Sequence, residues 1–317
     1  AGSPVTDYMV NYHDVLVAAE KALRELLEAN LPNPGVTLTL NETIDINFYT
    51  PTGMDHTGFT AKVYLDGQEL DASRYSIDVA KDGRLRVRYC FNSNKMFQEL
   101  TVQFFDANGN PATKARTMGV RSYVEAILAK STDATVRATL IQMLDYGALS
   151  QTLKGNDLDN LANSIITAEL RAEVENYNWP ASTETATETS GTKNGSGFSV
   201  SLTLNETIDI NFYTEAKNLE NGNTVKVLRN GKATDDYTLD LMEDGRYRVR
   251  YSVQSNLMCD VISVQIVDAD GKAVKEARSM SARAYAQIIL ENKAYSTLDK
   301  AAMVAMLNYG TLAQINS

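Results

Sequence analysis

The aromatic side chains of this chain are its most promising chemistry, because flat rings can bind sugars. One face of a pyranose ring is apolar and packs on Trp or Tyr, while the hydroxyl rim needs Asn, Asp, Gln or Lys. The chain has 16 Tyr but a single Trp. That residue, Trp179, lies in ENYNWPAST together with Tyr177. Trp179 either seals a domain edge or forms part of a binding groove with Tyr177.

A thirteen-letter string that occurs twice supplies more candidates. LTLNETIDINFYT covers residues 38–50 and again residues 202–214. Each copy ends in an Asn and a Tyr on the polar face of an expected strand. These are core residues if helices cover that face and ligand contacts if the cover is incomplete. Together with the corresponding segments ASRYSID and TDDYTLD, the string gives the candidates Tyr49, Tyr213, Tyr75, Tyr237, Asn47 and Asn211.

Hydrolysis of a polysaccharide would need two carboxylates about 5–10 Å apart. Asp45 and Asp209 lie in the middle of the repeated string, but a structural interpretation is simpler: arginines on polar strand faces pair with them. The arginines concerned are Arg86, Arg88, Arg248 and Arg250. The two histidines, His13 and His56, are far apart, and neither a catalytic triad nor an HExxH helix is suggested. We therefore expect no enzymatic activity.

The sequence predicts no metal and no cofactor. The turns DANGNP and DADGK resemble the start of a calcium loop, but Thr117 and Ser279 occupy the twelfth position, where a bidentate Glu is needed. No Gly-rich phosphate loop follows a strand. Cys90 and Cys259 fall at non-equivalent places in the two copies and form no CxxC pair. We expect two independent free thiols.

The charge and hydropathy of the chain exclude two kinds of partner. With 40 acidic and 30 basic side chains, the formal net charge is −10. Nucleic-acid binders depend on clustered Lys and Arg, so no nucleic-acid partner is expected. No run of about twenty apolar residues is present, so no membrane span is expected.

The candidate residues belong to two copies of one domain. Residues 82–128 align with residues 244–290 without a gap, and the copies close with MLDYGALSQ (143–151) and MLNYGTLAQ (306–314). We call residues 38–151 the first repeat and residues 202–314 the second repeat. Each is long enough to fold alone and too long for a solenoid unit.

Within each repeat, strands come first and helices follow. Ile44, Ile46 and Phe48 alternate with polar residues, which predicts a half-buried strand. Five to seven such strands favour a small antiparallel sandwich. VRSYVEAILAK and residues 133–151 then show apolar residues at helical spacing, and residues 157–178 are predicted helical as well.

We predict an α+β fold of two lobes, each an antiparallel β-sandwich followed by a helical cluster. Residues 1–35 form an N-terminal amphipathic helix packing on lobe 1, and residues 36–180 form lobe 1. Residues 181–197 are a flexible Ser/Thr/Gly linker, and residues 198–317 form lobe 2. The apolar stripe of the N-terminal helix comprises Tyr12, Val15, Leu16, Ala19, Leu23, Leu26 and Leu27.

Four ordered motifs carry a resemblance to a known family. They are LxLNxxIxINFY, MxDxxxVxxxDADG, RxYAxxIL and MLNYGxxAQ. The chain resembles a duplicated β-sandwich-plus-helix module of secreted surface proteins of gut and rumen Firmicutes, including starch-adherence-system proteins of the ruminococcal amylosome. The first repeat departs from the pattern at Gln98, where the second repeat has Asp260, and at MLDYG, which replaces MLNYG. Neither change is expected to disturb the fold.

The residues predict a duplicated module with aromatic binding potential and no catalytic set. The resemblance implies an extracellular, cell-surface protein that binds polysaccharide, with starch or another α-1,4-glucan as the favoured ligand. Other proteins of a cell-surface complex are further partners that the resemblance implies. The alternative is a structural or adhesion module that spaces other domains or binds protein. Two lobes contacting one polymer would bind it more tightly than a short oligosaccharide.

Overall fold

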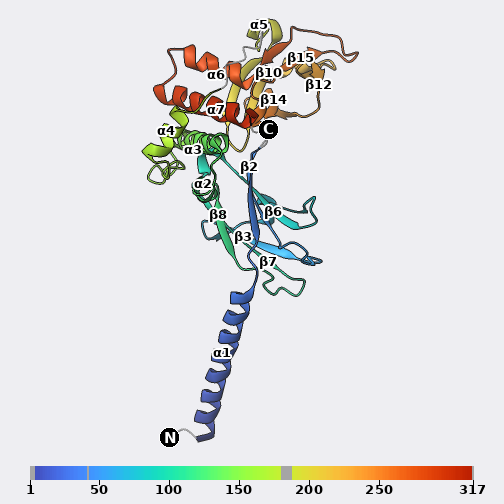
Figure 1. The fold of residues 1–317 in the computed structure, drawn as a ribbon. Helices are drawn as coiled ribbons and strands as arrows, with labels where there is room; N and C mark the ends of the chain where they lie inside the picture. The colour runs from blue at the N-terminus through green and yellow to red at the C-terminus, as the bar shows by residue number, and fades with distance from the viewer. Residues whose placement is uncertain (1–3, 41–42, 180–187, 316–317) are drawn as a thin grey trace. The chain divides into compact units, whose positions relative to one another are not determined.

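The first repeat begins with two antiparallel four-stranded sheets in this computed structural model, which describes residues 4–40, 43–179 and 188–315 (Figure 1). The strand orders are β1-β2-β6-β5 and β4-β3-β7-β8. The strands are β1 (Gly35–Leu40), β2 (Ile44–Tyr49), β3 (Thr60–Leu65), β4 (Gln68–Glu69), β5 (Ser76–Val79), β6 (Leu85–Phe91), β7 (Glu99–Phe105) and β8 (Arg116–Gly119).

The second repeat has the same topology, with orders β9-β10-β14-β13 and β12-β11-β15-β16. Its strands are β9 (Ser199–Leu204), β10 (Ile208–Glu215), β11 (Thr224–Arg229), β12 (Lys232–Ala233), β13 (Thr238–Leu241), β14 (Arg246–Val253), β15 (Ile262–Val267) and β16 (Arg278–Met280). Short 3-10 turns lie at η1 (Ala72–Arg74), η2 (Ser93–Lys95), η3 (Ala216–Leu219) and η4 (Ser255–Leu257). The predicted α+β class with antiparallel sheets is confirmed, although each repeat contributes eight strands, more than expected.

The predicted half-buried strand is buried on both faces. On β2 the burial covers the apolar residues and also Asp45, Asn47 and Tyr49, of which Asn47 is 1% exposed. In the second repeat Asn211 is equally buried, and α6 (Ala282–Glu291) packs against β9 and β10. The alternation was correct, but both faces of this strand are covered.

Two helices follow the sheets of each repeat, as the change of periodicity predicted. In the first repeat they are α2 (Val120–Leu128) and α3 (Ala134–Lys154), and in the second they are α6 and α7 (Thr297–Ile315). Asp133 caps α3 by accepting hydrogen bonds from two backbone amides, and Gly155 ends it with a φ of 65°. Residues 157–178 are helical only in α4 (Ala168–Glu175); turns fill residues 157–167.

The helix α3 packs against α7, and this contact organises the C-terminal part of the chain. Tyr146 and Tyr309, equivalent residues of the two closing motifs, stack with ring centroids 6.0 Å apart. The glycine that follows each tyrosine lets the helix approach its 3-10 turn. A Cβ on Gly147 would lie 2.7 Å from Met96 Sδ, and one on Gly310 would lie 3.0 Å from the carbonyl oxygen of Ser255. The recurring MLxYG motif is therefore a packing motif.

The chain divides into two compact units that differ from the predicted lobes. One comprises residues 1–37, 46–89 and 98–119; the other comprises residues 38–45, 90–97 and 120–317. The boundaries predicted at residues 36–180 and 198–317 put α3 and α7 in separate lobes. In the structure the two helices belong to one unit because they pack against each other.

The predicted flexible linker is partly ordered, and its residues 181–187 lie outside the described ranges. Glu188 is 8% exposed, accepts a hydrogen bond from Ser281 (2.6 Å) and pairs with Arg283. Ser190 bonds the backbone of Ser279 in both directions, and residues Lys193–Ser196 form α5. The Ser/Thr-rich composition concealed these anchors, because a single buried carboxylate can fix a polar segment.

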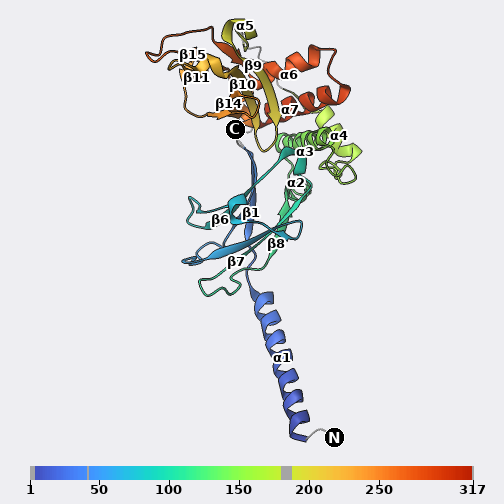
Figure 2. The same ribbon diagram turned by 180° about the vertical axis from the view of Figure 1, so that it is seen from behind.

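The N-terminal helix α1 (Pro4–Asn30) projects from the start of β1 (Figures 1 and 2), and its large apolar side chains within the described part are exposed, so the predicted packing on the sandwich is not found there. Leu16 is 51% exposed and Leu23 is 57% exposed. The segment after the helix is attached, since Lys114 donates a backbone hydrogen bond to Pro32 (3.0 Å). Only this end of the helix is anchored among the described contacts, so the amphipathic pattern requires another explanation.

Candidate functional site

An open pocket of about 470 Å³ lies where α3, α4 and α7 approach Trp179. Its volume falls within the range of small-molecule sites, about 300–1,000 Å³. The lining residues are Ile141, Gln142 and Asp145 of α3, Arg171, Val174 and Glu175 of α4, Asn308 of α7, and Trp179. The pocket thus combines an aromatic ring and two apolar side chains with amide, carboxylate and guanidinium groups.

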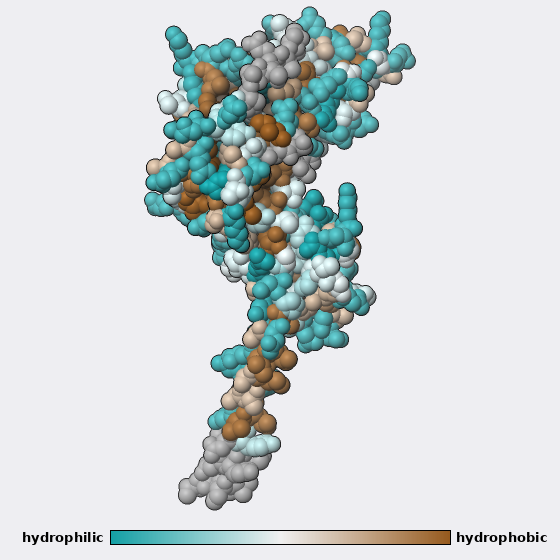
Figure 3. Space-filling view, in the orientation of Figure 1, coloured by the Kyte–Doolittle hydropathy of each residue, from teal (hydrophilic) through white to brown (hydrophobic). Residues whose placement is uncertain are grey.

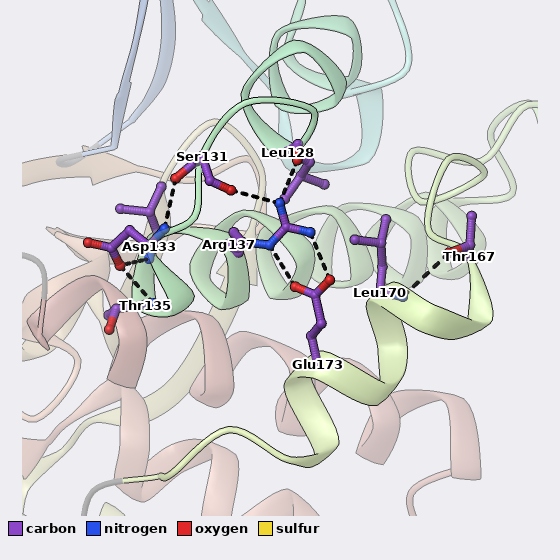
Figure 4. Close-up of polar contacts among 9 residues, drawn as sticks. Leu128, Ser131, Asp133, Thr135, Arg137, Thr167, Leu170 and Glu173 are labelled. Carbon is purple, nitrogen blue, oxygen red and sulfur yellow. Dashed lines mark hydrogen bonds and ion pairs between the residues drawn. The ribbon is translucent and has the colours of Figure 1, made fainter.

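Two sets of contacts position α4 at the pocket (Figure 4). Arg137 of α3 donates to both oxygens of Glu173 of α4 at 2.7 Å and also bonds the carbonyl oxygens of Leu128 and Ser131. Thr167 caps the start of α4 by accepting from the amide of Leu170 (3.4 Å). Bidentate pairing fixes the guanidinium plane, so α4 is held in one orientation against α3.

Asp145 makes the second set of contacts from inside the pocket wall. Its carboxylate accepts from Arg171 Nη1 at 3.0 and 3.1 Å and from Asn163 Nδ2 at 2.7 Å. The Asp145 side chain is 14% exposed, whereas that of Arg171 is 46% exposed. Arg171 is therefore held at the carboxylate while much of its surface remains accessible to a ligand.

Trp179 is half-buried and fixed by local contacts. Its indole Nε1 donates to the carbonyl oxygen of Val174 (3.3 Å), the last buried residue of α4. The ring of Tyr177 meets the indole edge to face, with centroids 5.5 Å apart, and the Tyr177 hydroxyl bonds Thr135 of α3 (3.1 Å). Edge-to-face packing leaves a broad face of one ring uncovered by the other. Trp179 is thus a preformed aromatic surface.

The amide side chains of the pocket come from the two repeats. Asn308 Nδ2 donates to Gln142 Oε1 at 3.0 Å across the contact of α3 with α7. Asn308 and Asp145 are equivalent positions of MLNYG and MLDYG. The residue that differs between the two closing motifs therefore lines the pocket: the first repeat supplies a carboxylate and the second repeat an amide.

The structure brings together only two of the eight predicted ligand contacts, Trp179 and Tyr177. The candidates on the repeated string are corrected: Asn47 and Asn211 are 1% exposed, and Tyr49 is buried. Tyr213 is half-buried under the guanidinium of Arg246, 4.8 Å from the ring centroid. Asn47, Asn211 and Tyr49 are core residues because both faces of their strands are covered.

Tyr75 and Tyr237 are half-buried and lie near strand starts, away from the pocket lining. The hydroxyl of Tyr75 reaches the carbonyl oxygen of Ala61 at 3.5 Å, and burial raises its pKa. Both correspond in position, as predicted, but neither joins the aromatic pair at Trp179. They are excluded from the candidate site.

The predicted pairing of Asp209 with a strand arginine is wrong. Asp209 accepts from the hydroxyls of Thr207 (2.6 Å) and Ser252 (2.8 Å). The arginines pair elsewhere: Arg86 with Asp78 and Arg248 with Asp240. Each arginine holds the pKa of its aspartate below the usual range. Asp209 is therefore a structural residue, as expected, but hydroxyl groups donate to its carboxylate where guanidinium groups were predicted.

The turns that resemble calcium loops are closed by their own carboxylates. Asp106 accepts from the backbone amides of Asn108 and Asn110, and Asp268 does the same for Asp270 and Lys272. Among the described residues no group of three His, Cys, Asp or Glu side chains could hold a metal ion.

The two thiols of the described chain are partly buried. Cys90 and Cys259 are free, and burial is the main cause that raises both thiol pKa values, for Cys90 to about 12. Both thiols are therefore protonated near neutral pH and weakly nucleophilic.

None of the helices that the structure describes has the length and apolar character needed to cross a membrane.

Sequence reasoning missed the polar residues of the pocket. Gln142 and Asp145 lie three residues apart on α3, a helix otherwise buried on most sides. A polar pair at that spacing on an apolar helix is a usable signal, because buried polar groups need partners. Arg171 and Glu175 carried no such signal, since they lie on the polar surface of a short helix.

The fold and the pocket define a duplicated α+β module with antiparallel sheets and an aromatic-lined cavity. No model of a known protein family matches the chain, and no curated protein sequence matches it. A chimeric titin Z1Z2-Z1Z2 tandem functionalised with a GRGDS peptide from fibronectin matches 78% of this chain and 97% of its own, at 10% identity and a TM-score of 0.18. The tandem Ig repeats of Dlar match 79% and 97%, at 10% identity and a TM-score of 0.17. Likeness this low carries no argument about function.

Proposed function

We propose that the protein is a non-catalytic carbohydrate-binding protein that takes its ligand at Trp179. The observation that carries this proposal is the meeting of one preformed aromatic face with amide and charged side chains in a single pocket of about 470 Å³. A pyranose ring needs those two kinds of surface together: an apolar face for stacking and hydrogen-bonding groups around the rim.

The favoured ligand is starch or another α-1,4-glucan. The pocket chemistry supports an uncharged sugar over an acidic one, since Gln142 and Asn308 are uncharged, Asp145 and Arg171 neutralise each other, and the carboxylate of Glu175 would repel an anion. The linkage rests on the family resemblance of the four ordered motifs. The same resemblance supports an extracellular position on a cell surface, beside other proteins that handle polysaccharide.

The engagement of Asp145 supports binding without catalysis. Glycoside hydrolysis needs one carboxylic acid to give a proton and another carboxylate to attack or activate water. Asp145 instead accepts hydrogen bonds from Asn163 and Arg171 at 2.7–3.1 Å. The lining contains one other carboxylate, that of Glu175. With Asp145 engaged in hydrogen bonds, Glu175 alone cannot supply both the acid and the base or nucleophile of the mechanism.

Native electrophoresis through gels containing amylopectin, xylan, β-glucan or no polysaccharide tests the proposal. We expect retardation of the wild type in amylopectin alone. Replacing Trp179 with Ala removes the stacking surface, and we expect the affinity to fall at least about tenfold, or roughly 1.4 kcal/mol. No release of reducing ends should accompany binding.

Tyr237→Ala is the matched control, because it removes another half-buried aromatic that lies outside the pocket. It should migrate as the wild type does. Equal loss in both variants would remove Trp179 from the site. Absence of retardation in every gel would favour the alternative, a structural or adhesion module on the cell surface, an assignment with which the buried Tyr49 is consistent.

A further inference from the structure

The helix α1 exposes an apolar face that the pocket does not explain. Its described apolar side chains are 51–63% exposed, and Figure 3 shows apolar residues gathered along this helix. They are Tyr12, Val15, Leu16, Val17, Leu23, Leu26 and Leu27. Soluble proteins rarely leave a contiguous apolar surface of this kind uncovered, so the face calls for a partner.

The spacing of the apolar residues identifies the kind of partner. Starting at Tyr12, apolar residues recur after four, three, four and three positions, and Val5 and Met9 extend the same series toward the N-terminus. The series in the described part is Tyr12, Leu16, Ala19, Leu23 and Leu26, which we call the α1 stripe. A repeat of 3.5 residues is the period of a helix that pairs with another helix of the same period.

A groove beside the C-terminal half of α1 extends this face. It measures about 550 Å³ and is lined by Leu23, Leu27 and Leu31, by Glu20 and Glu28, and by the β7–β8 hairpin tip at residues 109–111. The lining thus combines three leucines with two carboxylates. A second helix lying on the α1 stripe would fill it and cover the exposed leucines.

We propose that α1 pairs with α1 of a second copy of this chain, in antiparallel orientation. In the register that overlaps residues 5–30 of the two helices, residue numbers of facing positions sum to 35. This register sets Leu16 against Ala19 of the second copy and Leu23 against Tyr12 of the second copy. Large residues thus meet smaller or planar ones, and the α1 stripe of each copy covers that of the other.

Two further observations favour the antiparallel orientation. The folded remainder of the chain follows the C-terminal end of α1, where Pro32 bonds Lys114. Antiparallel helices therefore carry the two remainders at opposite ends, about 40 Å apart for a 27-residue helix. The flanking positions beside the stripe also meet in this register, and their residue numbers sum to 33. They bring Glu20 next to His13 of the second copy, a carboxylate–imidazole pair that occurs twice. In a parallel pair the flanking neighbour of Glu20 would be Val15 of the second copy.

Sedimentation equilibrium of the full chain tests the pairing. We expect a particle of twice 34.9 kDa for the wild type. Leu16→Glu puts a charge into the stripe and should weaken the dimer at least tenfold. Val17→Glu is the matched control, since Val17 is exposed to the same 51% but lies outside the stripe, and it should remain dimeric. A wild-type monomer, or equal effects of the two substitutions, would overturn the proposal.

Disulfide trapping tests the orientation. In a background with Cys90 and Cys259 replaced by Ser, Tyr12→Cys and Leu23→Cys proteins are mixed and oxidised. Antiparallel pairing should give predominantly the mixed disulfide. Predominant formation of the two homodisulfides would show a parallel pair and contradict the register. Neither experiment depends on glycan binding, so the pairing and the proposed function can fail independently.

Discussion

Asp145 links the position of α4 to the chemistry of the pocket. Its carboxylate joins Arg171, on α4, and Asn163, in the preceding turn, to α3. The equivalent position of the second repeat is Asn308, which faces Gln142 instead. One residue type could not perform both tasks, because Arg171 needs an anionic acceptor and Gln142 Oε1 needs a donor.

Exchanging these two residues gives a sharp test at this scale. Asp145→Asn leaves Arg171 without its carboxylate, and we expect the free energy of unfolding to fall by about 1 kcal/mol, because the partner is half-exposed. Glycan affinity should fall as α4 loosens. Urea denaturation and gel retardation measure the two effects. Adding Asn308→Asp should not rescue either one; full rescue would show that the two positions are interchangeable.

At single positions, the sequence identified the aromatic residues at the pocket better than the polar residues that line it. Trp179 was identifiable because it lies outside the repeated segments and has few neighbours in sequence to bury it. Tyr49 was misjudged as a possible contact, because the covering of the polar face of a strand depends on segments far away in the chain. The pocket polar groups come from three helices, and no local spacing connects Asn308 with Arg171.

At the scale of elements, the α3–α7 pair joins the two repeats through buried tyrosines. Tyr146 and Tyr309 are each 2% exposed and stack on each other. Burial raises the pKa of both phenols, for Tyr309 to about 12. Phenols that must remain neutral in the folded state make the helix pair sensitive to alkali.

The sign of this dependence follows from linkage. Between the ordinary pKa of 10.0 and the raised value near 12, the unfolded chain has lost the Tyr309 proton while the folded chain keeps it. Stability is therefore complete below pH 10 and falls as pH rises, by about 1.4 kcal/mol per pH unit for each such group. Tyr309→Phe should flatten this decline in urea titrations, whereas Tyr295→Phe, which replaces an exposed tyrosine outside the α3–α7 contact, should not. Identical slopes for all three proteins would contradict the account.

The elements themselves were largely predictable, because alternation and helical spacing are local. Even the change at Gln98 leaves its hairpin intact. Gln98 donates to Asp66 (2.9 Å), and in the second repeat Asn230 donates to Asp260 (2.8 Å), so amide and carboxylate have exchanged places. The ordering of residues 188–197 was not predictable, because it depends on Arg283, far along the chain.

At the scale of the whole molecule, the pocket changes the expected number of sites. One site per repeat was the basis for expecting tighter binding to polymer than to oligosaccharide. The described pocket instead takes residues from both repeats. Under the proposed function we therefore expect one ligand per chain, at Trp179, and we expect any gain on polymer to come from the proposed pairing through α1.

Calorimetry separates these contributions. We expect one short oligosaccharide per wild-type chain and an apparent affinity for polymer at least about tenfold higher, since two linked sites raise the effective concentration. Leu16→Glu should keep the oligosaccharide affinity and lose the gain on polymer. A stoichiometry of two per chain would contradict the single pocket, and a polymer gain that persists in Leu16→Glu would contradict the role of α1.

The sharing of one pocket by α3, α4 and α7 also limits how this module can be inherited. A gene fragment that carries one repeat to another protein would bring its sheets and helices but only one of the two closing motifs. The pocket would then lack either Asp145 or Asn308. The two copies are therefore not exchangeable parts of the pocket, and we expect a pocket of this composition only where both copies are inherited together.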